Sequence, residues 1–85
     1  MKYVFLSADC LINGDDVVAV LDMDRATVSQ ELRARLSAAE KAGMLINAAP
    51  KLPKSVIFLK DGRVYVSPLM AQTVKKRLTE DITVN

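Results

Sequence analysis

The sequence has no histidine, no tryptophan, only three glycines and a single cysteine, Cys10, in 85 residues. One cysteine cannot form an internal disulfide, and without histidine it leaves too few ligands for a structural zinc site. The missing histidine also removes the usual base that activates a nucleophile, and the glycines form no cluster that could hold a phosphate. These absences argue against an enzyme, and we expect no catalytic residue, cofactor, metal or small-molecule substrate.

Long hydrophobic runs are absent as well. The first apolar run, Tyr3 to Leu6, ends well short of signal-peptide length, and no later run could span a bilayer. We therefore expect a cytoplasmic protein without a membrane partner, with a single domain at residues 1–78 and a flexible tail at 79–85. Because 51% of the residues are hydrophobic and so short a chain has little interior, some apolar surface should contact another chain.

The first part of the chain alternates short apolar runs with turn signals. We predict strands at 3–6, 10–12 and 17–22. A reversal is expected at Asn13-Gly14, because both residues tolerate positive φ. Residues 17–21 are apolar on both faces of their strand, so we expect two layers to cover it.

One helix is expected over residues 28–42, with Thr27 as its N-cap and Gly43 as the residue that ends it. Met44 can then contact Ala39 in a Schellman-type cap, before a short strand over 44–46. The apolar residues at helical spacing are Val28, Leu32, Leu36 and Ala39, and Glu31 and Arg35 form an i,i+4 pair on the solvent side.

A β-hairpin is predicted around Asp61-Gly62, since a two-residue Asp-Gly loop favours a type I′ turn. That register places Lys60 opposite Arg63 and Phe58 opposite Tyr65. One face then carries Ile57, Leu59, Val64 and Val66, which are expected in the core. The other face carries Val56, Phe58 and Tyr65, with Lys54, Lys60 and Arg63 around it.

The last helix is expected after Ser67, which serves as its N-cap, with Pro68 at the first helical position. Met70, Val74 and Leu78 are predicted to line its inner face. Together these patterns predict an α+β fold: a small mixed or antiparallel sheet with one long central helix and a short C-terminal helix.

Basic residues are concentrated between positions 51 and 77. The segment contains Lys51, Lys54, Lys60, Arg63, Lys75, Lys76 and Arg77 against one acidic residue, Asp61. Its charge of +6, seven minus one, contrasts with +2 for the whole chain, and this asymmetry suggests an anionic partner such as DNA. The alternative is a solvated face, and the cations at 75–77 also suit a helix C-terminus.

The predicted face of Val56, Phe58 and Tyr65 has two interpretations. Aromatic rings surrounded by cations could stack exposed bases. Two aromatics are few for that role, and apolar faces usually seek burial, so we favour coverage by the N-terminal strands or by a second subunit. If a second subunit covers this face, Val56, Phe58 and Tyr65 form an oligomer interface.

Several short motifs, in this order, resemble the RemA/RemB family of bacterial extracellular matrix regulators. They are Asp16-Val17-Val18-Ala19, Gly43-Met44-Leu45-Ile46-Asn47-Ala48, Pro53-Lys54-Ser55, Ser67-Pro68-Leu69 and Thr73-Val74-Lys75-Lys76-Arg77-Leu78. Pro-Lys-Ser and Ser-Pro-Leu look closer to the RemB branch. The resemblance implies a subunit similar to LytTR-type DNA-binding domains, a ring-like homo-oligomer, and binding to the phosphates of double-stranded DNA to activate matrix and biofilm genes.

The loop before the hairpin departs from the family pattern. RemA-like members carry an arginine-rich run where this chain reads Lys51-Leu52-Pro53-Lys54. Lys51 and Lys54 match basic positions and Leu52 does not, and lysine lacks the bidentate fork of arginine. The leading hypothesis is a non-enzymatic, oligomeric DNA-binding regulator, and the alternative is a protein-interaction module that does not bind DNA.

Overall fold

The computed structural model describes residues 3–7, 9–23, 30–49 and 51–79. Its elements are β1 (Tyr3–Ser7), β2 (Cys10–Asn13), the short 3-10 helix η1 (Gly14–Asp16), β3 (Val17–Asp22), α2 (Gln30–Lys41), β4 (Leu45–Asn47), β5 (Ser55–Leu59), β6 (Val64–Ser67) and α3 (Ala71–Thr79). β1 and β2 form an antiparallel hairpin. The other strands form a four-stranded sheet in the order β3-β5-β6-β4, in which only β4 and β6 run parallel. The predicted α+β class and mixed sheet are confirmed.

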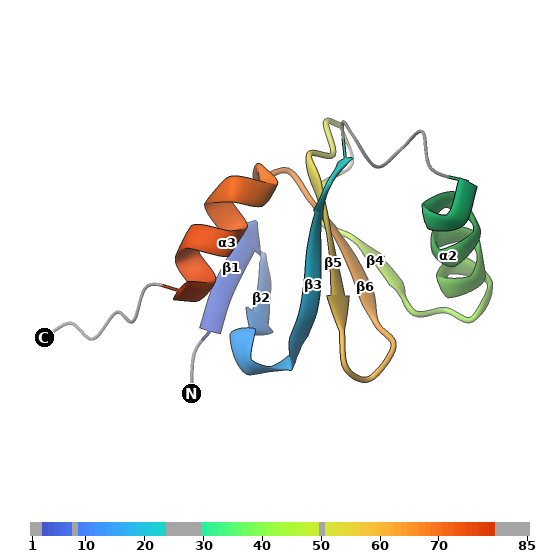
Figure 1. Ribbon diagram of the computed structural model, residues 1–85, viewed down its shortest axis with the longest axis horizontal. Helices are drawn as coiled ribbons and strands as arrows, with labels where there is room; N and C mark the ends of the chain where they lie inside the picture. The colour runs from blue at the N-terminus through green and yellow to red at the C-terminus, as the bar shows by residue number, and fades with distance from the viewer. Residues whose placement is uncertain (1–2, 8, 24–29, 50, 80–85) are drawn as a thin grey trace, which may run out of the picture.

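The four-stranded sheet lies between two layers (Figure 1). The β1–β2 hairpin and α3 lie on one side, and α2 lies on the other, beside β4. The larger core is buried under the hairpin and α3, and consists of Val4, Leu6, Ile12, Val20, Ile57, Leu59, Tyr65, Ala71 and Val74. A smaller core under α2 contains Ala39, Val56 and Val64, with half-buried Leu36, Met44, Leu45 and Phe58 packed against it.

The prediction that β3 is covered on both sides is only partly correct. β3 is an edge strand, and a bulge at Val18 interrupts its pairing with β5. Val20 is buried in the larger core, but Val18 is 65% exposed and Leu21 is also exposed. α2 packs beside β4 at the opposite edge of the sheet, so it leaves the outer face of β3 open.

The hairpin register differs from the prediction by one residue. Val56 pairs with Val66, Ile57 with Tyr65 and Phe58 with Val64. The Leu59 amide donates to the Arg63 carbonyl at 3.0 Å, so the loop has three residues, 60–62. Gly62 has φ +95° and no described non-glycine residue has positive φ, as expected for a type I turn followed by a glycine bulge rather than a type I′ turn.

This shift of one residue exchanges the two faces of β6. Tyr65 joins Ile57 and Leu59 in the larger core, while Val64 packs with Val56 in the smaller one. The predicted face of Val56, Phe58 and Tyr65 therefore does not exist on the subunit, because alternate residues of a strand point to opposite sides.

The C-terminal end of α2 was predicted correctly. Gly43 has φ +73°, its amide donates to the Glu40 carbonyl at 3.1 Å, and the Met44 amide donates to the Ala39 carbonyl at 2.8 Å. These two hydrogen bonds define a Schellman cap, and Met44 packs against Ala39. The predicted N-cap Thr27 and the core residue Val28 lie outside the described residues.

The helices differ from the prediction in other respects. The described part of α2 has 12 residues and lies on one side of the sheet, far from α3 in Figure 1, so a long central helix is not confirmed. α3 begins at Ala71 rather than at Pro68, because Ser67 ends β6 and is fully buried. Met70, predicted to face inward, is exposed, and Ala71 is buried in its place.

Thr79, where we expected a tail to begin, ends α3. Neither of the two helices in the described part of the chain has the length and apolar character needed to cross a membrane. The similarity to LytTR-type domains stays a prediction.

Candidate nucleic-acid interface

The structure divides the seven predicted DNA-binding cations into three groups. Lys51 and Lys54 precede β5, Lys60 and Arg63 flank the loop that follows it, and the other three lie on α3. Lys54 and Lys60 are six residues apart along an extended strand, which separates them by about 20 Å. The seven residues therefore do not form one compact basic site on a single subunit.

Lys51 and Lys54 lie together at one end of the sheet, which we call the loop end. They line a shallow cleft of about 420 Å³ whose other walls are Ala48, Ala49, Leu52 and Pro68. Lys51 is exposed and Lys54 half-buried. Among the described residues, no carboxylate lines this cleft, and no acidic side chain makes an ion pair with either lysine. Within this part of the chain, neither ammonium group is neutralised by a carboxylate.

Backbone hydrogen bonds hold the loop end at both sides. The Ala48 amide donates to the Val66 carbonyl at 2.8 Å, and the Lys54 amide donates to the Ser67 carbonyl at 2.8 Å. The Asn47 side chain accepts a hydrogen bond from the Ala49 amide, also at 2.8 Å. The loop is therefore tied to β6 before and after the two lysines.

Two buried serines fix the strands that carry this loop. Ser55 and Ser67 are paired across β5 and β6, and both are fully buried. The Ser55 hydroxyl donates to the Leu69 carbonyl at 2.8 Å, and the Ser67 hydroxyl donates to the Leu6 carbonyl at 3.1 Å. These bonds join the sheet to β1 and to the segment before α3.

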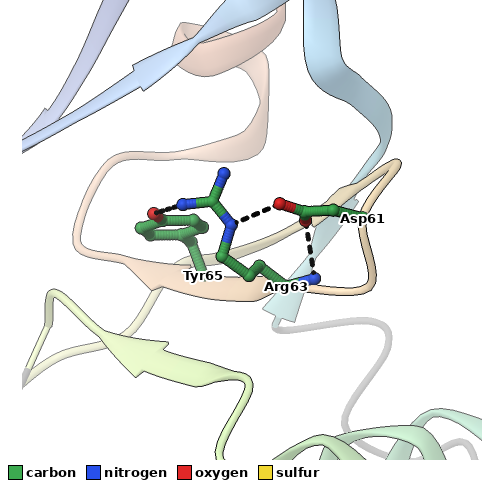
Figure 2. A network of polar contacts seen from close by, with 3 residues as sticks. All are labelled: Asp61, Arg63 and Tyr65. Carbon is green, nitrogen blue, oxygen red and sulfur yellow. Dashed lines mark hydrogen bonds and ion pairs between the residues drawn. The ribbon is translucent and has the colours of Figure 1, made fainter.

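The loop at the other end of β5, residues 60–63, which we call the hairpin tip, holds its cations differently. Figure 2 shows the Arg63 side chain between Asp61 and Tyr65. Its Nε donates to Asp61 Oδ2 at 2.7 Å, its Nη1 donates to the Tyr65 hydroxyl at 3.1 Å, and its guanidinium carbon lies 5.8 Å from the centre of the Tyr65 ring. The sequence analysis did not predict this network, although the i,i+2 spacing of the three residues is a signal for it.

The charges of Asp61 and Arg63 at the hairpin tip compensate each other. The Asp61 carboxylate accepts a hydrogen bond from the Arg63 amide at 3.0 Å, which, with the nearby guanidinium, lowers the pKa of Asp61. The pKa of Arg63 is raised, first by its side-chain hydrogen bond to Asp61, with a smaller contribution from the charge of Asp16. Arg63 is consequently occupied within the subunit.

The third group of cations is on α3. Lys75, Lys76 and Arg77 are exposed near the C-terminal end of the helix, where positive charge is favourable. Arg77 Nη1 donates to the Phe5 carbonyl at 3.2 Å and so joins α3 to β1. For Arg77 at least, the side chain has a structural role.

The residues predicted as an oligomer interface are separated. Val56 is fully buried and Tyr65 is 7% exposed, on opposite faces of the sheet. Phe58 is half-buried and lines a groove of about 420 Å³ between β3 and α2, together with Val18, Leu21 and other residues. Only Phe58 of the three can contribute to such a surface.

A second apolar surface was missed by sequence reasoning. Tyr3, Phe5 and Leu11 are exposed on the outer face of the β1–β2 hairpin, where Phe5 pairs with Leu11. The signal was present in residues 3–6, a strand in which every residue is apolar, so that whichever face packs inward leaves an apolar face outside.

The comparison with known families gives one match. Residues 4–78 match the model of the RemA-like family, described as extracellular matrix regulatory protein A-like. The match begins within β1 and ends within α3, so it includes every described element. It does not separate the RemA and RemB branches. No curated protein matches the chain.

Proposed function

Because this chain belongs to the RemA-like family of extracellular matrix regulatory proteins, we propose that it controls matrix and biofilm genes by binding double-stranded DNA as a non-enzymatic homo-oligomer. The observation that carries the DNA proposal is the loop end, where Lys51 and Lys54 share one cleft that no described carboxylate lines. The loop sequence Lys51-Leu52-Pro53-Lys54 offers charge without side chains that hydrogen-bond to base edges, so we propose contacts to phosphates rather than to base edges.

Two lysines on one subunit are a weak site. Each phosphate that a lysine neutralises releases counterions, and two such contacts per subunit give a slope of log K against log salt of about −2. Repetition of the loop end in a homo-oligomer adds contacts on the same DNA and raises the effective affinity. The proposal therefore depends on self-assembly as well as on charge.

Self-assembly is supported by the two exposed apolar surfaces. The groove between β3 and α2 and the outer face of the β1–β2 hairpin lie in different layers of the subunit. Contact between two unlike surfaces is heterologous, and repeated heterologous contacts close into a ring when the rotation allows it. A ring-like homo-oligomer is the assembly that we propose.

Fluorescence anisotropy with a labelled duplex, titrated at 50 and 200 mM salt, tests DNA binding. We expect affinity to fall with salt and to drop on the order of 30-fold in the double variant Lys51→Glu, Lys54→Glu, since each lost contact costs about 1 kcal/mol. The matched control is Lys75→Glu, Lys76→Glu, which changes the charge equally on α3. Absence of binding at 50 mM salt, or equal losses in the two double variants, contradicts the proposal.

The alternative function is a protein-interaction module, and the groove between β3 and α2 favours it. Val18 and Leu21 are exposed there, beside half-buried Phe58. On this alternative, Phe58→Ala changes the size of the assembly or its partners while the lysine variants have no effect. Light scattering of both sets of variants distinguishes the two functions, and a monodisperse monomer contradicts the homo-oligomer.

A further inference from the structure

Leu52 stands out among the exposed apolar residues of the described chain. It is 69% exposed, the largest value for a large hydrophobic side chain in the parts that the structure describes. A single exposed leucine is ordinary by itself. Leu52, however, lies between the two cations of the loop end and lines the same cleft as both of them.

The loop presents Leu52 from an anchored backbone. The chain is fixed to β6 before the loop through the Ala48 amide and after it through the Lys54 amide. The next residue, Pro53, is half-buried and has a restricted φ. Little backbone entropy is therefore lost when Leu52 enters a binding site. Its side chain is already exposed, so it need not be released from packing within the subunit before it binds.

The spacing of the cations fits the two sides of a DNA minor groove. Lys51 and Lys54 are three residues apart, so their Cα atoms are separated by at most about 11 Å. The minor groove of B-DNA is about 6 Å wide, and the two flexible lysine side chains can reach phosphates on its two strands. Leu52 lies between the two lysines in the sequence and lines the same cleft.

We propose that Leu52 inserts between two stacked base pairs from the minor groove and kinks the DNA, while Lys51 and Lys54 hold the flanking phosphates. This inference rests on the proposed DNA binding. Leucine is among the apolar side chains that proteins use as wedges of this kind, with cations nearby to hold the backbone. It also gives a role to Leu52, an uncharged and exposed residue between two lysines.

The inference has a consequence for sequence preference. Pyrimidine–purine steps such as TpA unstack and kink with the least energy. We expect the protein to prefer a duplex with a central TpA step over a G·C-rich duplex by roughly tenfold, within the range of single base-pair effects in other complexes. Preference arises here from the deformability of the DNA and not from hydrogen bonds to base edges.

The test uses a duplex with 2-aminopurine in a central TpA step, whose fluorescence rises when the base is unstacked. The wild-type protein should raise this signal at saturation. Leu52→Ala should abolish the rise and the TpA preference while binding the duplex within about fivefold, and Leu52→Met should retain both. Met70→Ala, at another exposed hydrophobic residue just before α3 and outside the surfaces proposed for assembly, is the matched control and should behave as wild type.

The outcomes are distinguishable from those that test the proposed function. Salt-dependent binding without a change in 2-aminopurine fluorescence overturns the insertion of Leu52 and leaves the phosphate contacts standing. An equal signal in wild type and Leu52→Ala also overturns it. If Leu52→Ala instead changes the size of the oligomer by light scattering, Leu52 lies in a contact between subunits, which overturns the proposal too. Absence of any binding overturns both the inference and the proposed function.

Discussion

The loop end and the hairpin tip lie at opposite ends of β5, and each carries two of the predicted cations. At the loop end, buried serine hydroxyls and backbone hydrogen bonds hold the structure, and the charges of Lys51 and Lys54 are not used for it. At the hairpin tip, Arg63 is bound to Asp61 and Tyr65. The difference shows that an arginine in one basic segment can be held within the subunit while the lysines of another segment of equal basic content carry no such contact to a described acidic residue.

The largest effect is expected from Ser67→Ala at the loop end. The Ser67 hydroxyl donates to the Leu6 carbonyl and accepts from the Leu69 amide at 3.0 Å, and its loss leaves buried groups without a partner. We expect the free energy of unfolding to fall by about 1–3 kcal/mol in urea denaturation. Thr79→Ala, which removes an exposed hydroxyl bonded to the Lys76 carbonyl, is the control and should change it by less than about 0.5 kcal/mol.

A smaller loss is expected from Gly62→Ala at the hairpin tip. Gly62 has φ +95°, which an alanine adopts only with strain, and an added Cβ would lie 3.5 Å from the Met44 side chain, an ordinary contact. The backbone strain should lower the free energy of unfolding by about 1–2 kcal/mol. DNA affinity should be unchanged if the loop end alone binds DNA. A loss of DNA affinity in this variant would show that the hairpin tip also contributes to binding.

The loop that contains Gly62 illustrates which features of the fold could be predicted from the sequence. The positions of β1, β2, β3 and the end of α2 follow from local signals, and these predictions were correct. The hairpin register was wrong because Asp61-Gly62 suits two loops. A type I′ turn needs positive φ at Asp61 as well, whereas the three-residue loop needs it only at Gly62 and leaves the Asp61 carboxylate free to accept the Arg63 amide.

The candidate site was predictable only in part. Residue type and spacing identified Lys51 and Lys54, which the loop brings to one cleft. They did not show that Arg63 is bound within the subunit, because the three-residue loop that brings the Asp61 carboxylate to Arg63 depends on the hairpin register. Nor could they show that β3 is an edge strand with Val18 outside, since strand order depends on contacts between distant segments.

Asp61→Asn tests whether the charge of Arg63 is masked by its partner. The substitution removes the ion pair at 2.7 Å, but both side chains are substantially exposed, so we expect no measurable change in the free energy of unfolding. The released guanidinium should raise affinity for DNA by no more than about fivefold in the anisotropy titration. Adding Arg63→Gln should remove that gain, and a gain that persists would contradict the masking of Arg63.

The smallest effect concerns pH. The pKa of Asp61 is lowered in the folded protein by the Arg63 amide and guanidinium, so the contribution of this pair is present above the ordinary pKa of an aspartate, about 3.9, and is lost as pH falls through the lower folded value. NMR titration of the Asp61 carboxyl should show a pKa below 3.9. In Arg63→Gln the value should move upward, and an unchanged value would assign the shift to the backbone amide alone.

The central claim is that DNA binds at the loop end and not at the hairpin tip. Anisotropy titration of one duplex at 50 mM salt with two double variants tests it most directly: Lys51→Glu with Lys54→Glu, and Lys60→Glu with Arg63→Glu. The two variants change the formal charge equally, by −4 each. We predict a loss on the order of 30-fold for the first and less than about threefold for the second. Equal losses, or a larger loss at the hairpin tip, would contradict the claim.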